Sequence, residues 1–353
     1  MPPKSRSTQI DVARLAGVSQ AMVSYVVNGN TTVKIPDDTR QRILEAMNEL
    51  GYVPNALARG LRSGRTKTIG LVVPDNSNPF FAEIARFIEN IGFQNGFSVI
   101  LCNSDYDLAK ENAHIDVLLA KQIDGVIFCS SGGTSEAQQK LRDGKTPWVT
   151  MDHDISGLQT DSVLIDYQLG GYLATRHLLD LGHQRIGCIT GPTQFSSSSE
   201  RLEGYLKALK EANLPIDPAL IVPGDFRIRG GEAAMLELLN LERPPSAVFA
   251  FNDLMAIGAM QGARIRGLQV PDDVSIVGFD DIPLAEALYP TLTTIAQPIS
   301  EIARVVMEIL LGQVQGSPGE PVAKTFNRVV LQPILMVRAS TRAIDATDRQ
   351  AHR

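Results

Sequence analysis

The sequence has few cysteines and no long apolar run. Its three cysteines, Cys102, Cys129 and Cys188, stand in apolar, strand-like stretches without metal-site spacing. No apolar stretch approaches the roughly 18–20 residues that a membrane-spanning helix needs, and none follows the first residues, as a secretory signal would require. We therefore expect buried, reduced thiols and a cytoplasmic protein that makes no membrane contact.

Common catalytic and metal-binding motifs are missing as well. The run Gly144-Lys145-Thr146 matches the end of a phosphate-binding loop, but Gln139 stands where that loop needs its first glycine. The sequence has no G-x-S-x-G elbow, and its five histidines have no HExxH or other metal-ligand spacing. We expect no enzymatic activity, no metal and no cofactor.

The charge that is present is unevenly distributed. Residues 1–68 hold ten Lys or Arg against five Asp or Glu, a balance of +5, so the rest carries −11 within a total of −6. A basic head on an acidic body fits a polyanion-binding module joined to a larger regulator, although a solvated basic face has the same composition. The length of 353 residues indicates two or three folding units.

Residues 8–50 predict three short helices. Thr8 with Asp11 three residues later is typical of a capping-box start, and Gly17 ends the first helix. Ser19 caps a second helix that runs to about Val27. A third helix opens at 36–38, has apolar residues on one face and ends at 51. Residues 54–67 form a basic linker in which 56–61 have the pattern of one short helix, too short to be stable alone.

The spacing within residues 11–28 is that of a helix-turn-helix. Ala13 and Ala16 are small enough for two helices to approach closely, and Gly17 permits the sharp turn between them. Val18 and Val23 fill the angle between the helices. Outward positions of the second helix would then face a DNA major groove; a generic three-helix core is the alternative.

From residue 68 onward, short apolar runs alternate with amphipathic helical stretches. The predicted strands are 69–73, 99–101, 125–129, 148–151, 186–189, 247–251 and 275–279, and the predicted helices are 80–94, 167–181, 201–212, 231–241 and 253–266. This alternation indicates parallel sheets covered on both faces. The strands are too many for one sheet, so we expect an α/β clamshell with lobes near 68–160 and 161–290 and a return to the first lobe after 290–294.

The head resembles that of the LacI/GalR family of bacterial repressors, and the resemblance runs from Thr8 across nearly the whole chain. It implies DNA contacts by Ser19, Gln20, Ala21, Ser24, Tyr25, Asn28, Thr39, Tyr52 and Asn55. It also implies that Leu61, on a hinge helix, wedges into the minor groove and kinks the duplex. Two positions depart from the family pattern. Tyr25 stands where several relatives carry Arg or His, and Gln9 stands where an apolar residue is usual.

The body resembles the type I periplasmic binding proteins, in which ligands bind between the lobes at the carboxyl ends of strands. Candidates should therefore follow apolar strand runs. Their positions after predicted strands, together with the resemblance, imply the following ligand-binding residues: Asn78, Phe80, Phe81, Asp152, Arg201, Phe226, Asn252 and Asp280.

These residue types suit a neutral polyol. Two carboxylates, one guanidinium and one amide satisfy vicinal hydroxyls, while aromatic rings cover an apolar sugar face. A purine or nucleoside is the alternative ligand. Four residues also have purely structural interpretations: Phe80 as core, Asn252 as a helix cap, Arg201 in a surface ion pair with Glu200 or Glu203, and one of Asp280 and Asp281 as a cap.

The sequence thus predicts a helix-turn-helix domain (1–53), a hinge helix and linker (54–67), a two-lobed effector-binding and dimerisation domain (68–340) and a polar tail (341–353). The expected function is a homodimeric repressor that binds a pseudo-palindromic operator and is controlled by a small ligand, most simply a sugar. A sugar-binding protein without a DNA role is a remote alternative.

Overall fold

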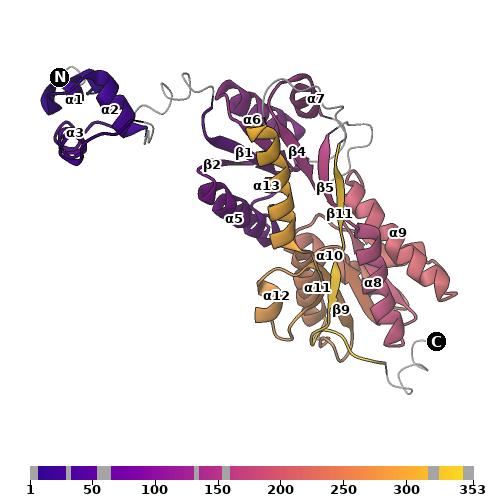
Figure 1. Cartoon of the computed structure of the whole chain (residues 1–353). Coiled ribbons are helices and arrows are strands. Elements are labelled where there is room, and N and C mark those ends of the chain that lie inside the picture. Colours follow the sequence, from indigo (N-terminus) through magenta and orange to yellow (C-terminus); the bar gives the residue numbers. More distant parts are fainter. Residues whose placement is uncertain are drawn as a thin grey trace. The chain divides into compact units, whose positions relative to one another are not determined.

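The structure, a computed structural model, describes residues 7–28, 33–53, 65–130, 135–152, 160–316 and 326–344 (Figure 1). The chain divides into two units, Met1–Thr66 and Lys67–Arg353. The predicted hinge helix, with Asn55 and Leu61, and most of the predicted polar tail lie outside the described residues.

The first unit, the head, contains α1 (Gln9–Ala16), α2 (Gln20–Val27) and α3 (Asp37–Glu49). The predicted capping box is confirmed, because the Thr8 hydroxyl accepts from the Asp11 amide and the Asp11 carboxylate accepts from the Thr8 amide. Gly17 ends α1 with a φ of 66°, a left-handed conformation that glycine adopts without strain. The side chains that form the head's core are mostly small: Val12, Ala13, Ala16, Val23, Val26, Ile35, Ile43 and Ala46.

No single helix in the described ranges is long and apolar enough to cross a membrane. Only α1 and α2 taken together pass such a test, and they meet at an angle of 108°. That angle lies within the range of about 90–120° typical of a helix-turn-helix.

The second unit, the body, contains two six-stranded sheets that define two lobes (Figure 1). In the first lobe the strand order is β11-β5-β4-β3-β1-β2 and every pairing is parallel. Its strands are β1 (Thr68–Val73), β2 (Ser98–Asn103), β3 (Gly125–Phe128), β4 (Trp148–Met151), β5 (Asp161–Ile165) and β11 (Arg328–Leu331). Leu71 and Val72 of β1 point into cores on opposite faces of this sheet, as a parallel sheet covered on both sides requires.

Two pairs of helices cover those faces. Helices α5 (Pro79–Gln94) and α13 (Ile299–Gln315) pack together on one face, and α6 (Leu108–Ala120) and α7 (Glu136–Asp143) pack on the other. Figure 1 shows α13, from late in the sequence, beside α5. Cys102, Cys129 and Cys188 are free and buried, as predicted.

The second lobe has the strand order β12-β10-β9-β8-β6-β7. Its strands are β6 (Ile186–Thr190), β7 (Ile221–Pro223), β8 (Ala247–Ala250), β9 (Ser275–Asp280), β10 (Thr293–Ala296) and β12 (Ile334–Met336). Its helices are α8 (Tyr167–Asp180), α9 (Ser196–Glu211), α10 (Ile228–Leu239), α11 (Asp253–Ile265) and the short α12 (Leu284–Ala287), with a 3₁₀ turn at Pro218–Leu220. The helices pack as the pairs α8 with α9 and α10 with α11.

The predicted lobe boundary near residue 160 is wrong. Strand β5 pairs with β4 in the first sheet, so the first lobe continues to Ile165 before the chain crosses into α8. The predicted return to the first lobe does occur, in α13 and β11, but only after β10 has joined the second sheet.

Strand β12 is antiparallel to β10, which the expectation of parallel sheets did not include. The chain leaves β11 at the carboxyl end of the first sheet and enters the second lobe without an intervening helix. It therefore runs along β10 in the reverse direction.

Candidate functional site

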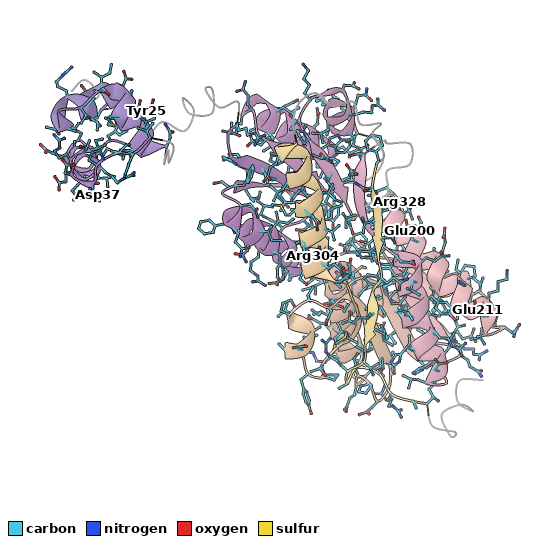
Figure 2. The ribbon with its side chains drawn as sticks, viewed as in Figure 1. Tyr25, Asp37, Glu200, Glu211, Arg304 and Arg328 are labelled. Atoms are coloured by element: carbon cyan, nitrogen blue, oxygen red, sulfur yellow. The ribbon has the colours of Figure 1, made fainter. Side chains whose placement is uncertain are left out.

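The DNA-contacting positions predicted on α2 lie on the surface of the head. Ser19, Gln20, Ala21 and Asn28 are exposed, and Tyr25 is half-buried (Figure 2 labels Tyr25). The Ser19 hydroxyl accepts from the Met22 amide at 3.3 Å, so this residue caps α2 as predicted. The start of a helix carries partial positive charge and exposed amides, which favours a phosphate group.

Three more predicted contacts in the head have local hydrogen bonds or packing. Asn28 donates from Nδ2 to the Ser24 carbonyl at 2.6 Å and to its hydroxyl at 3.1 Å. Thr39 accepts from Arg42 at 3.3 Å at the start of α3, and Tyr52 packs against the head's core. These interactions fix the side chains but do not themselves identify a ligand.

All eight predicted ligand-binding residues line one cavity between the two lobes of the body. The lining residues are Pro74, Asn78, Phe80, Phe81, Tyr106, Asp152, Phe195, Ser197, Arg201, Phe226, Asn252, Asp280 and Gln297. The predicted members come from the ends of strands and the starts of helices in both lobes, which is the placement that the strand-end rule predicts.

The backbone around this cavity is strained. Tyr106, Asp152, Phe226 and Asp280 have positive φ angles, of 59°, 76°, 65° and 119°. Non-glycine residues adopt this region rarely, and such residues concentrate at functional sites. The strain therefore supports a functional role for the cavity, independently of its side-chain chemistry.

Arg201 is the central cation of the cavity. Its guanidinium lies over the neighbouring rings of Tyr167 and Phe279, 4.2 Å from each ring centroid, and the residue is only 5% exposed. Burial lowers its pKa, while the nearby carboxylates of Asp280 and Asp152 raise it. The alternative of a surface ion pair with Glu200 or Glu203 is therefore wrong.

A close approach of two helices fixes the position of Arg201. A methyl group at Gly171 of α8 would lie 2.2 Å from the Arg201 carbonyl oxygen on α9. Only glycine permits that packing, so the sequence of α8 determines where the guanidinium stands. One donor of Arg201 reaches the Ser197 carbonyl at 3.3 Å, whereas its Nε has no hydrogen-bond partner.

Asp280 is the buried carboxylate that faces Arg201. Gln297 donates from Nε2 to its Oδ1 at 2.7 Å. Burial raises the pKa of Asp280 to about 7, although Arg201 and the amides of Gln297 and Asn78 lower it. The adjacent Asp281 has a separate role, since it pairs with Arg338 at 2.6 Å.

Asn252, Asn78 and Phe80 combine structural contacts with their places in the cavity. Asn252 caps α11 by accepting from the Met255 amide at 2.8 Å, and its Nδ2 donates to the Phe226 carbonyl at 2.9 Å. Asn78 caps α5 in the same way, and Phe80 belongs to the hydrophobic core as well as to the lining. The structural interpretations of Asn252 and Phe80 are therefore correct, and both side chains still border the cavity.

The free volume of the cavity is small, about 30 Å³. Space of this size holds one or a few water molecules rather than a sugar ring. Two buried polar atoms of lining residues nevertheless lack a hydrogen-bond partner: Arg201 Nε and Gln297 Oε1. Because buried polar groups normally have partners, these atoms mark positions where a polar ligand can bind.

Five lining residues are not among the predicted ones: Pro74, Tyr106, Phe195, Ser197 and Gln297. Tyr106 follows β2 and Gln297 follows β10, so the strand-end rule applied to those strands would have found both. Phe195 lies directly before α9, which begins at Ser196 rather than near Arg201 as predicted. No group of three or more His, Cys, Asp or Glu side chains able to hold a metal exists among the described residues.

Comparison with known proteins gives two family matches. The profile described as bacterial regulatory proteins, lacI family, matches residues 8–55. The profile described as periplasmic binding proteins and sugar binding domain of LacI family matches residues 66–336. The HTH-type transcriptional regulator DegA of Bacillus subtilis (strain 168) is 41% identical over 339 residues, which cover 95% of this chain and 98% of DegA.

Two solved structures also match along the whole chain. One is a transcriptional regulator CelR–cellobiose complex, with 35% identity and a TM-score of 0.70, covering 95% of this chain and all of that one. The other is the lac repressor dimer bound to operator and the anti-inducer ONPF, with 28% identity and a TM-score of 0.82, covering 96% and 100%.

Proposed function

The chain belongs to the LacI family of bacterial regulatory proteins and is a DNA-binding transcriptional regulator, and we propose that a neutral sugar in the interlobe cavity controls its repression of an operator. Two copies act together on a pseudo-palindromic site, as in the lac repressor dimer on its operator. A regulator that works on operator DNA acts in the cytoplasm.

The observation that carries the sugar proposal is the buried group formed by Arg201, Asp280 and Gln297. A guanidinium and a carboxylate together present both donors and acceptors without excess charge, and Asp152 adds a second carboxylate. An anionic ligand would meet these two carboxylates in a site of low dielectric, which is unfavourable. Vicinal hydroxyls, which donate and accept, are a better match.

Two further observations support a sugar. The matching profile over 66–336 carries the description of a sugar binding domain, and the related CelR structure contains cellobiose. The aromatic rings of Phe80, Phe81 and Phe226 provide apolar surface for the face of a sugar ring.

A purine or nucleoside is the second candidate. The rings of Tyr106, Phe195 and Phe226 lie within 6.2 Å of one another, and a planar base also stacks on aromatic rings. A neutral base would form hydrogen bonds with the same amides and carboxylates as a sugar. A binding experiment is therefore needed to distinguish the two ligand classes.

In the proposed mechanism, the ligand changes the arrangement of the two lobes and thereby the DNA affinity of the head. The hinge segment 54–62, with Asn55 and Leu61, lies outside the described ranges, and we assign to it the contact with the minor groove. Repression then depends on a two-state element that both ligand and DNA bias. Ligand binding that favours the DNA-bound state would give co-repression, and the opposite preference would give induction.

The first experiment is a thermal-shift screen of the full chain against neutral mono- and disaccharides and nucleosides. A ligand that binds the folded state raises Tm with concentration. The operator, selected from random DNA, is then titrated by fluorescence anisotropy with and without the positive compound. We expect a sugar to raise Tm and to change operator affinity in the wild type but not in Arg201→Ala. A nucleoside that does this in place of a sugar would contradict the sugar proposal.

A further inference from the structure

Tyr106 brings an aromatic ring from the first lobe into contact with the second. It lies just after β2, and its ring centroid is 5.2 Å from that of Phe195 and 6.2 Å from that of Phe226. The contact with Phe195 is edge-on, whereas the Tyr106 and Phe226 rings are stacked at 27°. Tyr106 therefore covers a face of Phe226 that would otherwise be open to a ligand.

The turn that carries Tyr106 holds the ring in this place. Asp105 and Tyr106 both have left-handed backbones, with φ of 53° and 59°. Lys110 pairs with the Asp105 carboxylate at 2.5 Å, and Asn103 donates to the same carboxylate at 2.6 Å. The Tyr106 amide donates to the Pro74 carbonyl at 3.1 Å. A left-handed backbone that several hydrogen bonds and an ion pair hold in place is typical of a residue with a functional role.

The phenol end of Tyr106 extends toward the polar part of the cavity. Burial raises the pKa of its hydroxyl, and the carboxylates of Asp75, Asp152 and Asp280 and the thiol of Cys129 add to that increase. The ring thus spans the cavity from Phe226 toward the carboxylates, and the space left beside it is about 30 Å³. A sugar ring does not fit into that space while Tyr106 keeps its position.

The neighbouring ring of Phe226 is restrained by its own lobe. The tip of the Phe226 ring packs over Gly191, where a methyl group would lie 2.1 Å from it. Asn252 also holds the Phe226 backbone through its carbonyl. Tyr106 comes from the other lobe, so it is the ring that can separate from Phe226 when a ligand enters.

We propose that Tyr106 is a resident plug of the effector cavity: its ring occupies the place where the effector's ring stacks on Phe226, and the effector binds by displacing it. The cost of displacement weakens the affinity for every ligand and sets the threshold concentration for the response. The inference rests on the proposed function only for the identity of the ligand.

The plug can be tested without any ligand through Cys129. This thiol is fully buried, and its Sγ lies 3.7 Å from Oδ2 of Asp152, a residue that lines the cavity. The full chain is treated with methyl methanethiosulfonate, and modification is followed at each cysteine by mass spectrometry. We expect Tyr106→Ala to speed the modification of Cys129 at least about tenfold, because the cavity opens to solvent.

Two controls sharpen this measurement. Tyr106→Phe keeps the ring and should leave the rate at Cys129 unchanged, and Cys188, buried in the second lobe, should react at the same slow rate in all variants. Tyr106→Ser replaces Tyr106→Ala if the alanine variant does not fold, as judged by circular dichroism. An unchanged rate at Cys129 in a folded Tyr106→Ala or Tyr106→Ser chain overturns the proposal.

Calorimetric titration with ribose, glucose and cellobiose gives the second test. The plug predicts that Tyr106→Ala binds the positive sugar at least about tenfold more tightly than the wild type, because no ring has to be displaced. Tyr289→Ala is the matched control, since that tyrosine is fully exposed. Weaker binding by Tyr106→Ala would make Tyr106 a stacking contact and overturn the plug. If Cys129 is labelled faster in Tyr106→Ala but no variant binds any of the sugars, the plug is supported and the sugar proposal is contradicted.

Discussion

The head and the body recognise their ligands with surfaces of opposite character. The predicted DNA contacts on α2 are exposed or half-buried, on a small scaffold whose core consists mostly of valine and alanine. Of the eight predicted ligand contacts in the body, six are buried and two, Asp152 and Phe226, are half-buried, and they stand at the strand ends of two large sheets.

This difference indicates which residues determine ligand specificity in the body and in the head. In the body, packing on Phe279 positions Arg201, and a hydrogen bond from Gln297 positions Asp280. In the head, the side chains of Gln20 and Ala21 are exposed. Substitutions in the cavity should therefore have large effects that combine binding and stability, and substitutions on α2 should have moderate effects on DNA binding alone.

The largest effect is expected for Arg201→Ala. The substitution removes the buried cation whose charge stabilises the nearby Asp280 carboxylate and should weaken effector binding by about 2–5 kcal/mol. Isothermal titration of the full chain with the effector measures this loss. Arg304→Ala is the matched control, because Arg304 is an exposed α13 residue paired with Glu308 (Figure 2 labels Arg304). Effector affinity within twofold of the wild type in Arg201→Ala would remove this residue from the site.

The second prediction concerns the pH dependence of stability. The pKa of Asp280 is about 7 in the folded chain, above its ordinary value of 3.8, so between these pH values the folded state holds a proton that the unfolded state has released. The free energy of unfolding should therefore fall as the pH rises from about 4 to 7, by a few kcal/mol from this group.

Asp280→Asn tests this dependence because an amide does not titrate. Relative to the wild type, the variant should gain stability steadily between pH 4 and 7, as measured by urea unfolding at each pH. A stability difference that stays constant over this range would contradict the raised pKa. The Asp280 carboxylate raises the pKa of the buried Asp253, so the difference between the two proteins reports the titration of both carboxyl groups.

A smaller effect is expected on the head. Gln20→Ala removes an exposed side chain that faces the proposed major groove and should weaken operator binding by about 1–3 kcal/mol. Stability should change by less than about 0.5 kcal/mol, since the side chain is exposed. Fluorescence anisotropy on the selected operator gives the affinity, with Gln41→Ala on α3 as the control. Equal losses in both variants would show that position 20 has no special role.

The smallest effect separates the two roles of Ser19. Ser19→Ala removes the cap of α2 and should destabilise the head by about 1 kcal/mol, seen as faster amide exchange in α2. Ser19→Asp keeps a capping oxygen but adds negative charge next to the DNA phosphates. It should restore the exchange protection while lowering operator affinity; normal affinity in this variant would place position 19 away from the DNA backbone.

Much of the architecture follows from the sequence pattern. The capping residues Thr8 and Ser19 and the apolar run 148–151 identify their elements almost to the residue, because caps and fully buried strands have strong local signals. Strands β5, β7, β10 and β12 each include at least one residue that is not fully buried, so their apolar signal is weaker than that of β4. Their pairing depends on distant parts of the chain, and the lobe boundary was misplaced for that reason.

The prediction of the cavity residues depended in the same way on which strands the sequence pattern identifies. Strands recognised in the sequence led to correct lining residues such as Asp152 and Asp280. Gln297 was missed because β10 was interpreted as a connection. Tyr106 lies shortly after the end of β2, so the strand-end rule reaches it, although no periodicity reveals the left-handed turn that carries its ring.

The late strands β11 and β12 have a consequence for biosynthesis. The helices of the head are complete by Glu49, whereas the first sheet receives its last strand only at Arg328–Leu331, after most of the second lobe has been synthesised. On the ribosome, the head should therefore fold long before either lobe is closed. A chain cut before residue 328 would leave β5 and β10 as open sheet edges, so truncated products should aggregate rather than persist as unregulated DNA-binding fragments.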